Sequence, residues 1–156
     1  MTFAELEQNL YWAFEQSSMA VVVHSSWSGL PTTGGTDPYA AHHAAAKLHL
    51  RVGELPPDQR DLIRAKYGLV PGALAATAAL LRQTFNFNEP VAEGMVLCWL
   101  NHRQRPHFAE LATLSDVSLR TIKRRASEVY RFLDDLLLHA LHVLLDNCVQ
   151  DVWHSV

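Results

Sequence analysis

Residues 107–131 read HFAELATLSDVSLRTIKRRASEVYR, and this stretch decides the expected fold. A short helical run from Phe108 to Thr113 meets a turn at Leu114–Val117, and a second helix is expected from Ser118. The residues whose spacing would hold two crossed helices together are Phe108, Leu111, Ala112, Val117 and Ile122. The pattern predicts a helix-turn-helix, the motif whose second helix enters the major groove of DNA.

Two residues of this turn bear on whether the second helix can start there. Ser118 is a preferred N-cap, because its side-chain oxygen can accept a hydrogen bond from a backbone N–H that the helix leaves unpaired. Asp116 stands where such turns commonly carry glycine, at a position that tends to need a left-handed backbone. Aspartate tolerates that conformation better than most residues, so the motif is still expected.

The candidate DNA-binding residues lie on or beside the open face of the second helix and in the basic connector before the motif. They are Ser118, Arg120, Thr121, Lys123, Arg124 and Arg125, with Arg103 and Arg105 in the connector. Arginine can be bidentate to guanine, whereas lysine acts more as a point charge on phosphate. Two alternatives stay open: a plain helical hairpin whose basic side chains are solvated, and a connector that is only a solvated loop.

Charge is distributed unevenly along the chain. The whole sequence carries a formal net charge of -3. Residues 101–131 hold seven lysines and arginines against three acidic residues, a local charge of +4 that leaves -7 for the rest. A positive segment on an acidic body is a better nucleic-acid footprint than the total charge indicates. The acidic remainder would either discourage nonspecific DNA binding or meet a basic protein surface.

Composition indicates a globular chain, with 49% hydrophobic and 19% charged residues. Its 156 residues predict one helical domain over 1–156. No apolar run reaches the roughly 18 to 20 residues that a membrane span needs, and the acidic N-terminus does not resemble a signal peptide. We therefore expect a cytoplasmic protein without a membrane segment, in which Cys98 and Cys148 are buried reduced thiols.

Proline and glycine punctuation predicts an all-α fold. The expected helices are Thr2–Gln16, Pro38–Leu55, Pro57–Gly68 with Gly68 as C-cap, Pro71–Gln83, Pro90–Asn101 and the two helices of the motif. Thr2 and Glu5 have the spacing of a capping box. The segment 25–38 is expected to be a loop, in which Trp27 is either a plug onto the core or an exposed contact.

The last helix has no sequence signal that would stop it, because neither proline nor glycine follows Ser118. One wide apolar face is expected to be buried: Val129, Phe132, Leu133, Leu136, Leu137, Ala140, Leu141, Leu144, Leu145 and Cys148. Leu138, Val143 and Val149 extend the apolar character beyond that face. The helix would pack on the chain's own helices, or it would also form a homodimer or partner contact.

Signals for catalysis and for metal binding are weak. His42 and His49 are seven residues apart on a predicted helix, too far for one metal ion without outside ligands, and His43 does not complete a set. The pairs Cys98–His102 and His139–His142 offer two ligands each. No hydrolase, metalloprotease or phosphate-loop motif is present. We therefore predict no enzyme activity, no cofactor and no metal site.

Several segments together resemble one family. A Trp27-containing loop precedes a DxxA-like helix start at Asp37–Ala40, LPPDQRDLIRAKYG follows at Leu55–Gly68, and LATLSDVSLRTIKRRASEVYRFLDDLL follows at Leu111–Leu137. They resemble the phage late-gene antiterminators called Q proteins, which carry a helix-turn-helix similar to that of sigma-factor region 4. The resemblance rests on these segments and leaves Pro71–His107 without a counterpart.

The resemblance implies a phage transcription antitermination factor in a bacterial host cell. Such a protein would bind double-stranded DNA near a late promoter, load onto bacterial RNA polymerase holding sigma factor, and suppress pausing and termination. Two alternatives stay open. One is a helix-turn-helix repressor or activator that forms a homodimer through its C-terminal helix. The other is a protein-only inhibitor of the host transcription machinery.

Overall fold

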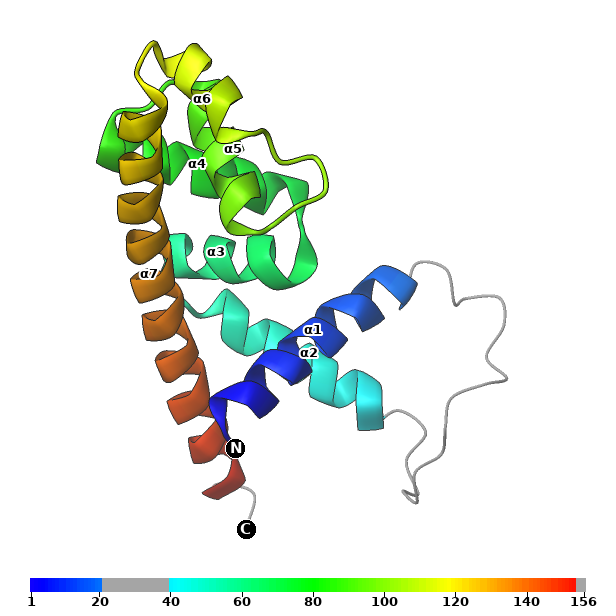
Figure 1. Cartoon of the computed structure of the whole chain (residues 1–156). Coiled ribbons are helices and arrows are strands. Elements are labelled where there is room, and N and C mark those ends of the chain that lie inside the picture. Colours follow the sequence, from blue (N-terminus) through cyan, green and yellow to red (C-terminus); the bar gives the residue numbers. More distant parts are fainter. Residues whose placement is uncertain (21–39, 154–156) are drawn as a thin grey trace. The chain divides into compact units, whose positions relative to one another are not determined.

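The computed structural model describes residues 1–20 and 40–153, which are helical apart from short connections (Figure 1). The helices are α1 (Phe3–Ala20), α2 (Ala40–Gly53), α3 (Pro57–Gly68), α4 (Pro71–Phe85), α5 (Glu89–Trp99), α6 (Phe108–Ser115) and α7 (Leu119–Trp153). The predicted all-α fold with a long C-terminal helix is confirmed. The expectations for Trp27, for Asp37 and for the 25–38 loop lie outside the described residues.

The chain divides into two compact units, which we call unit 1 and unit 2. Unit 1 comprises Met1–Leu55 and Leu141–Val156, and unit 2 comprises Pro56–Ala140. Helix α7 contributes residues to both units. The prediction of a single domain stays a prediction. Within the described residues, no helix combines the length and the apolar character that crossing a membrane requires.

In unit 1, α1 and α2 pack on each other. The expected capping box starts α1: the Thr2 N–H donates to Glu5 Oε2 at 2.7 Å, and the Glu5 N–H donates to Thr2 Oγ1 at 3.3 Å. His49 of α2 lies across the helix pair, with Nε2 at 2.6 Å from Ser17 Oγ and 3.0 Å from the carbonyl oxygen of Ala13. A packing role in the α1–α2 contact therefore accounts for His49.

In unit 2, α3, α4 and α5 pack in sequence order, and each has proline in its first turn, where a missing N–H costs nothing. The predicted Gly68 cap is wrong, because Gly68 is the last helical residue and Leu69 takes the left-handed conformation with φ 48°. The Leu69 N–H donates to the Ala65 carbonyl at 3.2 Å. Val70 is extended, with φ -67° and ψ 121°, as expected for a residue before proline, so the chain passes from α3 to α4 through one left-handed and one extended residue.

The buried face of α7 is narrower than the sequence predicts. The fully buried members of the expected face are Val129, Leu133, Leu137, Ala140, Leu141 and Leu144, whereas Phe132, Leu136, Leu145 and Cys148 are half-buried. Leu138 is 50% exposed. The expectation of buried thiols is also wrong, because Cys98 and Cys148 are only half-buried.

Candidate nucleic-acid interface

The α6–α7 segment, residues 108–131, follows the turn chemistry that the sequence predicts. Asp116 ends α6 in the left-handed conformation, with φ 52° and ψ 44°. The Val117 N–H donates to the Ala112 carbonyl at 3.1 Å, which closes the turn. Ser118 Oγ then accepts the Thr121 N–H at 3.2 Å, so Ser118 caps α7 as expected. The turn therefore fixes where α7 starts.

Apolar residues on both sides of this turn are buried. Leu111 and Ile122 have no exposed surface, and Ala112 is 7% exposed. The other two residues expected in this contact, Phe108 and Val117, are only half-buried. The inward line continues along α7 through Ala126 and Val129. Three of the five residues expected in the contact between the two helices are thus buried, and the contact itself stays a prediction.

Gly94 of α5 brings α6 close to α5. A Cβ atom at position 94 would lie 2.5 Å from Leu111 Cδ2 and 2.9 Å from Pro106 Cγ, which is closer than side-chain atoms approach. Gly94 was not among the residues expected to position the motif. An isolated glycine inside a helical pattern was the available signal, because such a glycine costs up to about 1 kcal/mol unless packing requires it.

Asn88 links the start of α5 to the end of α6. Its Oδ1 accepts the Val91 N–H at 3.1 Å and caps α5, while its Nδ2 donates to the Leu114 carbonyl at 3.0 Å. The second bond satisfies a carbonyl that the last turn of a helix leaves without a helical partner. Gly94 and Asn88 together position α6, and therefore the turn, on α5.

The outer face of α7 is basic over its first three turns. At about 100° per residue, one line of side chains lies opposite the buried line Ile122, Ala126, Val129 and Leu133. This outer line comprises Arg120, Arg124, Ser127 and Arg131, all exposed. Lys123 is also exposed, beside this line. Arg131 was not among the candidate site residues. Its helical spacing was readable from the sequence, because it follows Ser127 by four residues, Arg124 by seven and Arg120 by eleven.

Two candidate residues of α7 lie on its flank. The Arg125 guanidinium lies 5.7 Å from the centre of the Phe87 ring, and the residue is half-buried. Thr121 is half-buried too, with its hydroxyl 2.9 Å from Ser118 Oγ. A cation over an aromatic face gains electrostatic stabilisation, so Arg125 also anchors α7 to the segment before α5. Their DNA-binding role stays a prediction.

The connector before α6 carries the remaining candidates. Arg103 and Arg105 are both exposed. Arg105 Nη1 donates to the His102 carbonyl at 3.1 Å, which ties that side chain to the connector backbone. Arg103 extends from the same connector, so both charges lie in one stretch that directly precedes α6. Their contact with phosphate stays a prediction.

A shallow hollow of about 500 Å³ lies on the outer face of α7. Its lining residues are Arg124, Ser127, Glu128, Arg131, Phe132 and Asp135. Two arginines thus share the hollow with two carboxylates, and Asp134 and Asp135 follow three and four residues after Arg131. Because carboxylates repel phosphate, the basic face ends at Arg131.

Burial shifts two titrating groups behind this face. The pKa of the Tyr130 hydroxyl is raised to about 12, chiefly by burial and secondarily by the neighbouring Cys98. Burial also raises the pKa of the Cys98 thiol, whose Sγ donates to the Pro106 carbonyl at 3.3 Å. Both groups are therefore neutral at ordinary pH. The charge of this region comes from its surface residues.

The histidines, cysteines and acids do not gather into a metal centre in the described ranges, where no cluster of three or more could hold an ion. His142 instead packs edge-on against Phe3, with ring centroids 4.6 Å apart.

Comparisons with protein-family models, with curated proteins and with solved structures find no match for this chain.

Proposed function

We propose that the α6–α7 segment is a DNA-binding helix-turn-helix and that the first turns of α7 enter the major groove of double-stranded DNA. The observation that carries the proposal is the outer line Arg120, Arg124 and Arg131 opposite a fully buried line on the same helix. A helix that presents one basic face and is anchored by the other can be pressed against the phosphates without disturbing its core. The capped start at Ser118 supports the same orientation, since the N-terminal residues of a recognition helix contact the bases.

The basic line on α7 is long enough for its residues to contact different parts of the DNA. At 1.5 Å per residue, Arg120 and Arg131 are separated by about 16 Å along the axis, more than the roughly 12 Å width of the major groove. We therefore assign Arg120, Lys123 and Arg124 to base edges and nearby phosphates, and Arg131 to the sugar–phosphate backbone. Ser118, Thr121 and Arg125 flank the groove, and Arg103 and Arg105 contact phosphate beside it.

The regulatory role that we propose is transcription antitermination. Its support is the resemblance of Leu55–Gly68 and Leu111–Leu137 to the phage Q proteins. In this role the protein would bind DNA near a late promoter, load onto bacterial RNA polymerase that holds sigma factor, and suppress pausing and termination. The acidic remainder of the chain favours such an arrangement, because it restricts DNA contact to one basic face and leaves the other surface for protein.

DNA binding is tested with the triple variant Arg120→Ala, Lys123→Ala, Arg124→Ala. Fluorescence anisotropy on DNA selected by the wild-type protein should show at least a hundredfold loss of affinity, since each lost contact costs about 1–3 kcal/mol. The slope of log affinity against log salt should become less negative by about 2.7, at 0.9 per phosphate contact. The matched control removes three charges elsewhere in unit 2, Arg60→Ala, Arg64→Ala and Arg82→Ala, and should lose little. Unchanged affinity in the first variant would contradict the proposal.

Antitermination needs a separate measurement, which is in vitro transcription across a terminator from the promoter region that carries the selected DNA site. Readthrough that depends on both the protein and that site supports the role. DNA binding without readthrough would indicate a conventional repressor or activator. Leu138, which is exposed on α7, offers a dimer contact for such a regulator. A dimer that binds a palindromic site would identify this alternative. Inhibited transcription without DNA affinity would identify a protein-only inhibitor.

A further inference from the structure

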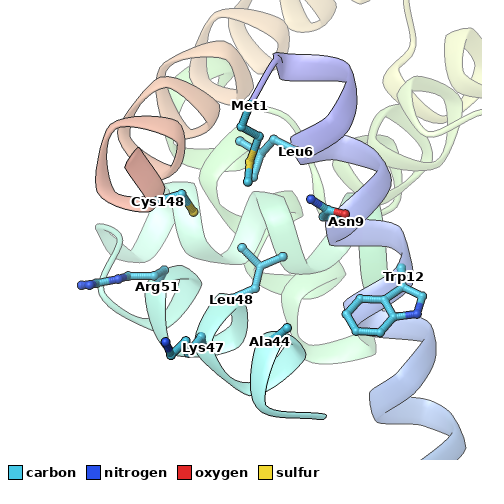
Figure 2. A pocket seen from close by; sticks show the side chains of 9 residues that line it. All are labelled: Met1, Leu6, Asn9, Trp12, Ala44, Lys47, Leu48, Arg51 and Cys148. Atoms are coloured by element: carbon cyan, nitrogen blue, oxygen red, sulfur yellow. The ribbon is translucent and has the colours of Figure 1, made fainter. Parts of the chain in front are cut away.

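Unit 1 contains a cavity of about 400 Å³ that the proposed DNA-binding role does not use (Figure 2). Its walls come from three elements: Leu6, Asn9 and Trp12 on α1, one face of α2, and Cys148 near the end of α7. The volume falls within the 300–1,000 Å³ that small-molecule sites occupy. The cavity is therefore large enough for a ligand rather than for a few waters.

The α2 wall combines apolar and basic residues on a single face. Ala44, Lys47, Leu48 and Arg51 are spaced three, four and seven apart, so they lie along one side of the helix. Figure 2 shows Leu48 and Ala44 beside the hollow, with Lys47 and Arg51 at one edge of it. The lining thus has an apolar body and a basic edge.

The two cations are distinctive because of where the rest of the charge lies. In the sequence of unit 1, Lys47 and Arg51 are the only lysine or arginine residues, against seven acidic ones. Both line the cavity, and no acidic side chain that the structure describes in unit 1 does. A net charge of -5 for the unit therefore coexists with a locally positive cavity edge.

The two cations differ in their partners. Arg51 Nη1 lies 2.8 Å from Glu54 Oε2, so a carboxylate already compensates its charge in part. Lys47 has no carboxylate partner in the part of the chain that the structure describes. The ammonium of Lys47 is consequently the cation most available to an anionic ligand group, with Arg51 beside it.

We propose that this cavity binds a small amphipathic carboxylate, with its hydrocarbon chain against Leu6, Trp12 and Leu48 and its carboxylate at Lys47 and Arg51. At about 30 Å³ per water-sized group, 400 Å³ accommodates roughly a dozen such groups, which matches a medium-chain fatty acid. Burial of the chain supplies most of the affinity, and the cations select the charge of the head group. The site lies wholly in unit 1 and is independent of the proposed DNA face.

Three eight-carbon probes that differ only in the head group test the proposal: octanoate, octan-1-ol and octylammonium. Isothermal titration of the full chain should give octanoate at least a tenfold higher affinity than octylammonium, equivalent to about 1.4 kcal/mol. Lys47→Gln should lower the octanoate affinity about fivefold and leave the octan-1-ol affinity unchanged, because only the charged head group loses a partner. Equal affinity for octanoate and octylammonium would overturn the assignment of the charge.

The position of the ligand is tested with a tryptophan that fills the cavity from its exposed edge. Ala44→Trp adds a large side chain at an exposed position, so the fold should be retained, and it should lower octanoate affinity at least tenfold. The matched control is Leu50→Trp, at a 66% exposed position of α2 that does not line the cavity. Failure of octanoate to bind at millimolar concentration, or unchanged binding in Ala44→Trp, would overturn the proposal. DNA affinity, measured in parallel, should not change in either variant.

Discussion

Unit 1 and unit 2 carry opposite charge and place their cations on different kinds of surface. Unit 2 has eleven lysines and arginines against nine acidic residues, whereas unit 1 has two against seven. In unit 2 four exposed cations, Arg120, Lys123, Arg124 and Arg131, follow one another along the open outer side of α7. In unit 1 both cations border a cavity. The difference indicates that a line of cations along an exposed helix suits an extended polyanion, whereas two cations at the edge of a mainly apolar cavity suit a small anion.

This comparison also shows why the net charge of the whole chain is a poor guide. A total of -3 gives no sign of a face that could meet DNA, because the acidic residues of unit 1 cancel the basic ones of unit 2. Screening limits the reach of each charge to about 8–10 Å at ordinary salt. Local placement therefore matters more than the sum, and variants that change charge equally in the two units can separate their roles.

The largest expected effect comes from equal charge reversals in the two units. Arg124→Glu should weaken DNA binding at least a hundredfold, about 3 kcal/mol, because it removes a contact and adds a repulsive carboxylate. Lys47→Glu makes the same change of charge in unit 1 and should leave DNA affinity within about twofold. Fluorescence anisotropy at a fixed salt concentration measures both. Equal losses would mean that DNA contacts the two units alike.

A smaller effect is expected from adding one methyl group to a glycine of each unit. Gly94→Ala should reduce the free energy of unfolding by about 1–3 kcal/mol, because the new Cβ would overlap Leu111 and Pro106. Gly53→Ala meets no atom within 4 Å and should raise stability by up to about 1 kcal/mol, since alanine is the better helix former. Urea unfolding compares the two variants. A stable Gly94→Ala variant would show that α5 and α6 can separate without cost.

The smallest effect is a pH dependence of unit 2. The pKa of the Tyr130 hydroxyl is raised from 10.0 to about 12 in the fold. Tyr130 therefore adds stability that is fully present below pH 10 and is lost as the pH rises toward 12. The stability difference between pH 9 and pH 11, measured by urea unfolding, should therefore shrink in Tyr130→Phe. In unit 1 burial raises the pKa of Tyr11 too. The loss of stability between pH 9 and pH 11 should therefore be larger in Tyr11→Phe than in Tyr130→Phe. A larger loss in Tyr130→Phe would contradict the claim that Tyr130 makes the greater contribution.

The local chemistry of the turn was predictable because it depends on neighbouring residues. Ser118 as N-cap and a left-handed Asp116 both follow from which side chains accept those backbone positions. Helices α3, α4 and α5 were likewise predictable, since proline marks their starts. The cap at Leu69 was not, because sequence preference favours glycine for a left-handed residue, and Gly68 stands next to the position that adopts it.

Features that join distant segments could not be predicted from neighbouring residues in the sequence. Arg125 lies over Phe87, a residue 38 positions earlier, so its place on the flank of α7 depends on tertiary packing. The cavity of unit 1 needs walls from α1, α2 and the end of α7 at once. Periodicity identifies which face of each helix is apolar, but it does not show where three faces leave space between them.

Asn88 has a consequence for mutational tolerance. Its two bonds require one acceptor, for the Val91 N–H, and one donor, for the Leu114 carbonyl. Aspartate and serine are good N-caps, yet aspartate has no donor and serine is shorter, so neither reproduces both bonds. Substitutions that count as conservative at most helix starts therefore reduce stability at position 88. Fewer residue types should be tolerated there than at other exposed positions.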